Sequence, residues 1–290
     1  MDKDTFLNRK TTLNLKGELF DLTQPCVMGI LNVTPDSFYQ DSRNATIENA
    51  IQTAQTMLGE GAKMLDIGGY SSRPGAKEIS VQEEADRILP VIEALCQRFP
   101  GIILSVDTFR GQVARQAIEA GAHIINDISG YTLDEQMLEV VLHLNVPYIL
   151  MHMKGDPQTM QQSPAYQNVT LEVIAYYVEK IAELKRGGLK DLILDPGFGF
   201  AKNLQHNYQL LQEMEDLHLF GLPLLVGFSR KTMIRKVLQV ETQDALNGTS
   251  VLNTIALMKG AKILRVHDVK EAVQCIQLVT QTQQAASILN

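Results

Sequence analysis

Cysteine is scarce in this chain, and its metal-ligating side chains are scattered. Among 290 residues only Cys26, Cys96 and Cys275 occur, and no two of them form a Cys-x-x-Cys pair. An odd, widely separated set argues against a disulfide framework or a structural zinc site and indicates small buried apolar side chains. The 6 histidines show no His-Glu-x-x-His spacing, so we expect no transition-metal site built from protein ligands alone.

The chain also lacks an excess of positive charge and any long apolar run. Its net charge is -7, which argues against nucleic acid as the main partner, although a few clustered Arg, Lys and His side chains can still bind an anion. No apolar run approaches the roughly 20 residues that cross a bilayer, and the N-terminus has no apolar signal core. We therefore expect no membrane partner and a cytoplasmic location.

What the sequence does contain is a regular alternation of two patterns. Its 45% hydrophobic and 20% charged residues are typical of a globular protein. Short, nearly continuous apolar runs alternate with longer amphipathic segments, without a linker-like break. The strand candidates are 26–33, 64–68, 102–107, 123–128, 148–152, 192–195, 224–228 and 263–266.

Eight strand–helix units favour a closed (β/α)8 TIM barrel of the α/β class. Continuously apolar strands are typical of a parallel sheet that is covered on both faces. An open doubly wound sheet is the alternative, but no Gly-x-Gly-x-x-Gly opens the first helix, which disfavours a dinucleotide fold. We expect one domain over 1–290, with the barrel proper at about 26–280 and a short N-terminal hairpin at 11–24 that closes the barrel floor.

Polar side chains follow the apolar run at the end of every predicted strand. In a parallel barrel these ends share one face, where active sites form. Asp107 or Asp195 could instead cap a helix, and Asn126 could satisfy loop backbone. Arg73 and Arg230 could be solvated, and His267 could be a structural donor. Their joint occurrence favours a site, whose candidate residues are Asn32, Ser72, Arg73, Asp107, Asn126, Asp127, His152, Lys154, Asp195, Ser229, Arg230, Lys231, Arg265 and His267.

The residue types indicate two kinds of binding. Asp107, Asn126 and Asp195 provide acceptors and an amide that suit a planar heterocycle with adjacent N–H donors. The cationic donors, which suit a phosphate or diphosphate, are Arg73, Lys231, Arg265 and His267. The loops after the seventh and eighth strands of such barrels are frequent phosphate sites. Residue types and spacing alone predict a heterocycle joined to a phosphate group and go no further.

Eight segments, in order, resemble the motifs of the dihydropteroate synthase family. The first is Met28-Gly-Ile-Leu-Asn-Val-Thr-Pro-Asp-Ser-Phe38, and the others lie at 66–76, 105–108, 125–128, 150–155, 195–200, 227–231 and 265–268. The resemblance runs from about 27 to 269. It implies a transferase of folate biosynthesis, a sulfonamide target, that condenses 6-hydroxymethyl-7,8-dihydropterin diphosphate with p-aminobenzoate to give 7,8-dihydropteroate and diphosphate.

The resemblance also assigns roles to individual residues. The implied pterin ligands are Asp107, Asn126, Asp195 and Lys231. The residues implied around the diphosphate are Asn32, Arg265 and His267, and Val266 belongs to the same substrate-binding set. Those on the p-aminobenzoate side are Phe38, Ser72, Arg73, Pro74, Phe200 and Ser229. The implied catalytic residues are Asn32, Arg73, Asp107, Lys231, Arg265 and His267.

The same resemblance implies a cofactor, a reaction course and an assembly. Mg²⁺ would take one side-chain oxygen from Asn32 and its other ligands mostly from diphosphate and water. The bond between the pterin methylene and the diphosphate would ionise first, and the neutral aromatic amine would then attack. The family also suggests a homodimer packed through late helices.

Some residues depart from the family pattern, and two other functions stay open. Tyr70 stands where the family commonly has Glu, Ser72 where it commonly has Thr, and Ala201 replaces a frequent Gly, while 39–44 lacks a usual glycine pair. One alternative is a methyltetrahydrofolate-binding methyltransferase domain, which has no use for the cationic cluster. The other is a catalytically inactive pterin-binding module, which need not keep leaving-group residues.

Overall fold

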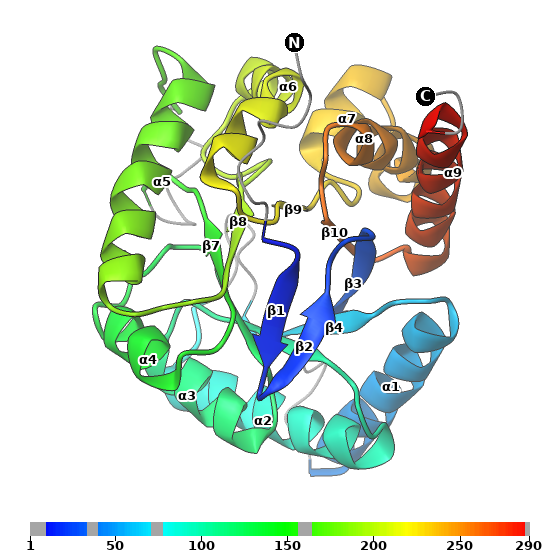
Figure 1. Cartoon of the computed structure of the whole chain (residues 1–290). Coiled ribbons are helices and arrows are strands. Elements are labelled where there is room, and N and C mark those ends of the chain that lie inside the picture. The colour runs from blue at the N-terminus through cyan, green and yellow to red at the C-terminus, as the bar shows by residue number, and fades with distance from the viewer. Residues whose placement is uncertain (1–9, 34–39, 71–77, 156–163, 288–290) are drawn as a thin grey trace.

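The barrel predicted from the sequence is present and closed. The structure is a computed structural model that describes residues 10–33, 40–70, 78–155 and 164–287. Eight parallel strands follow one another in the order β8-β7-β6-β5-β4-β3-β10-β9, and a parallel bridge between Leu194 and Leu224 joins the two ends. Helices surround this ring (Figure 1). The (β/α)8 prediction is confirmed, and the open doubly wound alternative is wrong.

The bounds of the elements follow the predicted alternation. The hairpin consists of β1 (Thr12–Leu15) and β2 (Glu18–Asp21). The barrel strands are β3 (Cys26–Asn32), β4 (Met64–Gly68), β5 (Leu104–Asp107), β6 (Ile124–Asp127), β7 (Tyr148–Met151), β8 (Leu192–Asp195), β9 (Leu225–Val226) and β10 (Ile263–Val266). The helices are α1 (Gln40–Gly59), α2 (Val81–Arg98), α3 (Gly111–Ala120), α4 (Gln136–Leu144), α5 (Val169–Arg186), α6 (Leu204–Gln212), η1 (Met214–Phe220), α7 (Thr232–Leu238), η2 (Thr242–Asp244), α8 (Leu246–Met258) and α9 (Val269–Ser287).

The hairpin closes the floor of the barrel, as predicted. Leu13, Leu15 and Leu22 are buried in one apolar cluster with the inward side chains near the start of the strands, such as Met28 and Ile193. Figure 1 shows β1 and β2 lying across the ring of strands. A larger apolar cluster lies between the outward faces of the strands and the helices. The strands are apolar on both faces because each face packs against one of these clusters.

The seventh strand is shorter than the predicted 224–228. It pairs with β10 only through Leu225 and Val226, and Leu224 makes a single bridge to β8. Beyond Val226 the chain leaves the ladder and turns into the loop that carries Ser229 and Lys231, so apolar sequence continues where strand pairing has ended.

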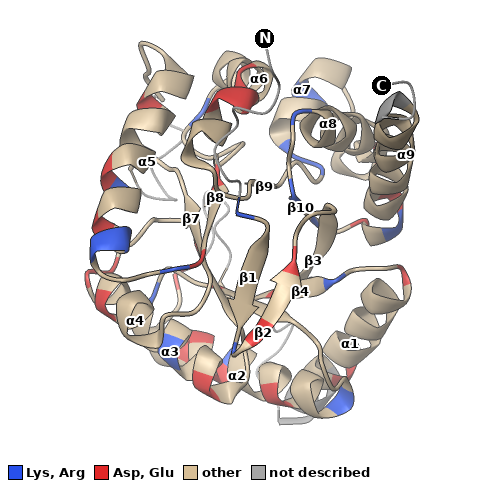
Figure 2. Ribbon diagram, viewed as in Figure 1, with Lys and Arg blue, Asp and Glu red and all other residues tan. Residues whose placement is uncertain are grey.

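Charge is distributed mainly over the outside of the barrel. Figure 2 shows most Lys, Arg, Asp and Glu on helices and loops, whereas the barrel strands are largely uncharged. The few charged residues within the strands therefore stand out as candidates for a site. Among the described residues, no helix combines the length and the apolar character needed to span a bilayer.

Candidate active site

A pocket opens at the carboxyl ends of the barrel strands. It encloses about 510 Å³ of space, part of it open to solvent. Its lining brings together eight of the predicted residues: Asp107, Asn126, Asp195, Phe200, Ser229, Lys231, Arg265 and His267. The remainder of the lining consists of Ile30, Ile128, Met151 and Gly227. The strand order therefore gathers the predicted acceptors and cations on one face.

Alternation along the strands explains why these residues share the pocket. On β8, Ile193 belongs to the floor cluster, and Asp195 is the next inward-facing position. On β10, Ile263 lies on the floor, and Arg265 and His267 are the next two inward positions. Apolar side chains thus fill the lower layer of the barrel, and polar side chains form the upper layer.

A partly buried ionic network forms the base of the pocket. The Arg265 Nε donates to Asp66 Oδ2 at 2.6 Å, and its Nη2 donates to Asp107 Oδ2 at 2.5 Å. The Asn126 Nδ2 also donates to Asp66 Oδ2, at 2.8 Å. Asp107 and Asn126 therefore serve the site and not a helix cap or loop backbone, and Arg265 is held inside the barrel by two carboxylates.

Asp66 is the site residue that the sequence reasoning missed. Its side chain is 0% exposed, and it connects Arg265 to Asn126 from below the pocket. A signal was present, because Asp66 is the one acidic residue within the apolar run of β4 and shares the inward face with Met64. The search was confined to residues after each run, and Asp66 lies in the middle of one.

Burial perturbs the titration of the pocket groups. Desolvation raises the pKa of Asp107 to about 7, with Arg265 opposing the shift and Asp66 adding to it. Desolvation also raises the pKa of Asp195, while the nearby Lys231 lowers it. The pKa of Lys231 falls to about 8, again mainly through burial. Such strongly perturbed groups in one cleft are typical of a functional site.

The loop after β8 brings an aromatic ring to the pocket. Asp195 Oδ1 accepts a hydrogen bond from the Gly197 amide at 2.8 Å, so it stabilises this loop and caps no helix. Lys231 Nζ donates to the Phe198 carbonyl at 2.5 Å and lies 4.8 Å from the centre of the Phe200 ring. The ammonium therefore contacts both the backbone and the ring that line the pocket.

Ser229 and His267 fix one another at the mouth of the pocket. The Ser229 Oγ accepts from the His267 amide at 3.2 Å and lies 2.9 Å from the His267 Nδ1. When the Ser229 hydroxyl donates its proton to Nδ1, the N–H of the neutral ring lies on Nε2. In that tautomer His267 is oriented as a hydrogen-bond donor through Nε2.

The described residues suit a magnesium ion held largely by substrate. No group of three or more His, Cys, Asp or Glu that could hold a metal occurs within the described ranges. Asn32 is exposed at the end of β3. Its Oδ1 lies near Asp107 across Gly68: a Cβ added at Gly68 would be 3.7 Å from the Asn32 Oδ1 and 3.6 Å from the Asp107 Oδ2. One amide oxygen at the rim fits a cation that keeps water and phosphate ligands.

Several predicted residues lie elsewhere. The Val266 side chain is buried in the outer core because it alternates with the inward Arg265. Arg230 is partly exposed and pairs with Asp268 through two hydrogen bonds of 2.8 and 2.9 Å. Asp127 accepts from the amides of its own turn. Four predicted residues lie outside the described residues: Phe38, Ser72, Arg73 and Pro74.

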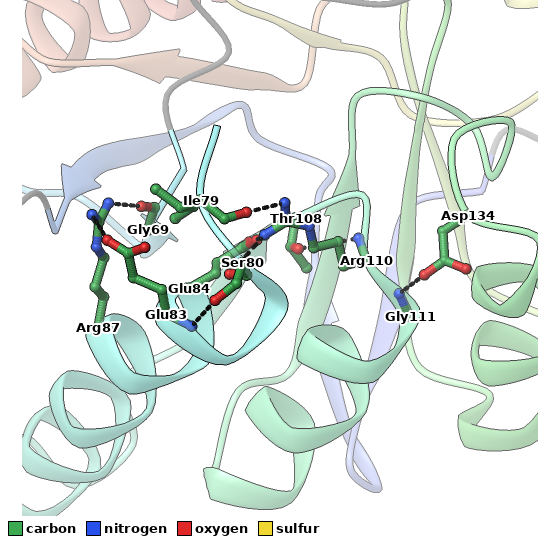
Figure 3. Close-up of polar contacts among 10 residues, drawn as sticks. All are labelled: Gly69, Ile79, Ser80, Glu83, Glu84, Arg87, Thr108, Arg110, Gly111 and Asp134. Carbon is green, nitrogen blue, oxygen red and sulfur yellow. Dashed lines mark hydrogen bonds and ion pairs between the residues drawn. The ribbon is translucent and has the colours of Figure 1, made fainter. Parts of the chain in front are cut away.

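The described residues on either side of 71–77 are tied to α2 and α3. Figure 3 shows Arg110, just before α3, reaching the carbonyls of Ile79 and Ser80, at 2.6 and 3.1 Å. Arg110 also forms a 2.7 Å ion pair with Glu84 on α2, and Arg87 donates to the Gly69 carbonyl at 2.9 Å. Backbone before the segment is thereby held by α2, and backbone after it is held by the residue that precedes α3.

The comparisons with known proteins agree with this geometry. The family profile of pterin-binding enzymes matches residues 28–267. The dihydropteroate synthase of Escherichia coli is 47% identical over 272 residues, which cover 93% of this chain and 96% of that protein. The corresponding enzyme of Haemophilus influenzae is 44% identical over 259 residues, which cover 89% and 94%.

Solved structures give the same result. The Yersinia pestis dihydropteroate synthase with a sulfonamide drug has a TM-score of 0.88 at 47% identity, covering 94% of this chain and 99% of that one. The Xanthomonas albilineans enzyme with 4-aminobenzoic acid has a TM-score of 0.86 at 39% identity, covering 94% and 98%. The chain therefore belongs to the dihydropteroate synthase family of pterin-binding enzymes.

Proposed function

We propose that the chain condenses 6-hydroxymethyl-7,8-dihydropterin diphosphate with p-aminobenzoate, giving 7,8-dihydropteroate and diphosphate in folate biosynthesis. The observation that carries this function is the pocket itself. One face combines the acceptors Asp107, Asn126 and Asp195 with the donors Lys231 and Arg265. A pterin needs the acceptors, and a departing diphosphate needs the donors.

The pterin half of the reaction is served by the acceptors. Asp107, Asn126 and Asp195 come from three strands and converge on one ring-sized space, where they accept the adjacent N–H groups of the heterocycle. When the carbon–oxygen bond of the methylene breaks, positive charge spreads into that ring, and the two carboxylates stabilise it. Binding and ionisation therefore depend on the same side chains.

The leaving group departs toward the rim. The donors that face it are the remaining N–H groups of Arg265 and the Nε2–H of His267, which Ser229 orients. Asn32 would hold a Mg²⁺ ion, which when bound supplies a Lewis acid that lowers the negative charge of the diphosphate. The electrons of the broken bond leave with the diphosphate, and the donors of Arg265 and His267 stabilise its negative charge.

The second substrate attacks from the side of Phe200. A neutral aromatic amine needs no prior deprotonation, so its nitrogen lone pair forms the new bond to the methylene carbon, and the resulting ammonium loses a proton to solvent. The resemblance adds Phe38, Ser72, Arg73 and Pro74 to this side. Holding both reactants in line provides much of the rate acceleration.

Diphosphate release separates this function from the two alternatives. We expect release from the pterin diphosphate to require p-aminobenzoate and Mg²⁺. A methyltransferase domain or an inactive pterin-binding module would release no diphosphate, and release without p-aminobenzoate would refute the synthase.

Asp195→Ala should mainly weaken pterin binding, whereas Arg265→Ala should mainly reduce turnover. Equal, minor effects from both variants would contradict the roles given to them.

We further propose a cytoplasmic homodimer that packs through late helices. Three apolar side chains repeat along one stripe of α8 and are exposed: Val251 at 49%, Ile255 at 37% and Met258 at 55%. A row of this kind suits a self-complementary contact. Light scattering should give twice the mass of one chain, and Ile255→Glu should give the mass of a single chain. A wild-type mass of one chain would refute the dimer.

A further inference from the structure

A lysine outside the substrate pocket is buried in a cage of backbone oxygens. Lys202 is 3% exposed, and its Nζ lies 3.0 Å from the Gly197 carbonyl, 3.1 Å from the Phe200 carbonyl and 3.3 Å from the His152 carbonyl. It also lies 3.0 Å from the His152 Nδ1. These partners belong to the loop after β8 and to the end of β7.

The cage is built for a cation. An ammonium has three N–H donors and no acceptor, and all four neighbours can accept. Among the described residues its hydrogen-bond partners include no carboxylate, so the carbonyl dipoles of the loop hold the charge. Burial lowers the pKa of Lys202 to about 7, while the Asp195 carboxylate opposes the shift, and burial pushes the pKa of His152 well below its usual value, so its ring is neutral. A charged Lys202 requires the His152 Nδ1 to accept, with the ring N–H on Nε2.

The loop around this lysine has a shape that needs such support. Gly197, Gly199 and Ala201 all have positive φ, at 69°, 82° and 48°, and a Cβ at Gly197 would overlap the His152 carbonyl oxygen. Ala201 adopts a left-handed conformation that glycine adopts more readily. The backbone therefore approaches β7 closely, with the carbonyls of Gly197 and Phe200 turned toward Lys202.

The other side of the same loop lines the substrate pocket. The Phe198 carbonyl, which lies between the two carbonyls that Lys202 holds, accepts from Lys231 instead. The Phe200 carbonyl points to Lys202 while the Phe200 ring lines the pocket under Lys231. By holding the Phe200 carbonyl, the buried Lys202 thus orients residue 200 so that its ring faces the pocket.

We propose that Lys202 is a positioning residue for p-aminobenzoate, acting through the Phe200 ring. The inference rests on the proposed function, because it assigns the Phe200 side of the pocket to the aromatic amine. Lys202 touches no substrate. It holds the wall against which the amine packs, and His152 supplies the fixed end of that support.

The kinetic test compares Lys202→Met with Lys236→Met, a control that removes an exposed lysine of α7. We expect Lys202→Met to raise the KM for p-aminobenzoate about tenfold, since a small misplacement in a site has an effect of this order or larger. The KM for the pterin diphosphate should change less than twofold. Lys202→Arg, which keeps the charge, should recover part of the loss. Equal changes in both KM values would overturn the proposal.

A second measurement needs no catalysis. The chain contains no Trp, so Phe200→Trp places a single indole in the wall. Adding Lys202→Met to that variant should increase acrylamide quenching of the indole at least twofold, while adding Lys236→Met should not. Unchanged quenching would overturn the positioning role. If the wild-type protein shows no synthase turnover but the quenching increases as expected, the proposed function is refuted, whereas the role of Lys202 in supporting the loop is not.

Discussion

Removing Arg110 should destabilise the protein through the carboxylate that remains. Arg110 and Glu84 form a 2.7 Å ion pair, and Glu84 is 0% exposed. Arg110→Met keeps an aliphatic stem of similar length but leaves Glu84 without its cation. Breaking a buried pair from one side lowers the free energy of unfolding by about 3–5 kcal/mol, because an uncompensated charge stays buried.

The pH dependence gives this prediction a sign. Burial raises the pKa of Glu84 in the wild type, while Thr108 and Arg110 lower it. Without Arg110 the pKa rises further. A carboxyl group with a raised folded-state pKa contributes stability that is present below its ordinary value of 4.5 and lost as pH rises through the folded value. The deficit of Arg110→Met should therefore grow from pH 5 to pH 8.

Urea unfolding of four proteins tests the reasoning: wild type, Arg110→Met, Glu84→Gln and the double variant. If the buried charge causes the loss, Glu84→Gln in the Arg110→Met background should restore stability at pH 8 and have little effect at pH 5. The lost bonds to Ile79 and Ser80 account for a residual deficit that does not depend on pH. A deficit that is constant with pH, or that the second substitution does not reduce, would refute the account.

Two further predictions concern the pocket. The kcat/KM for the pterin diphosphate should rise with pH through about 7, as Asp107 ionises, and fall above about 8, as Lys231 loses its proton. Asp107→Asn should abolish the rise on the acidic side of the profile, and a rise that persists in this variant would contradict the assignment. Asp66→Asn should lower kcat/KM at least tenfold, because Arg265 and Asn126 lose a shared acceptor; near wild-type kinetics would show that Asp66 is not required to orient them.

Most of the fold could be predicted because its periodicity is local. Each strand is an apolar run of a few residues, and burial on both faces makes that run continuous, as in 148–151. Strand ends were less accurate where pairing, not side-chain character, decides the boundary. The run at 224–228 continues as apolar sequence after the ladder has ended at Val226.

The site was predictable to the extent that it lies after the strands. Asp107, Asn126 and Asp195 follow apolar runs, so their shared face comes from barrel topology alone. Val266 shows the limit, since its neighbours in sequence face inward and it faces the helices. Asp66 shows the opposite limit, because a buried acid in mid-strand becomes meaningful only when a cation from a distant strand is seen to reach it.

The positions of the two anchoring cations could not be predicted, because their partners are backbone carbonyls that any residue provides. Arg110 binds carbonyls that follow 71–77, and Lys202 binds carbonyls of the loop after β8. The contacts of Arg110 also bear on Tyr70, which stands where the family commonly has Glu. Its ring lies 5.4 Å from the Arg110 guanidinium, whose charge is already balanced by Glu84. An acid at position 70 is therefore not needed to hold Arg110, and an aromatic ring packs against it instead.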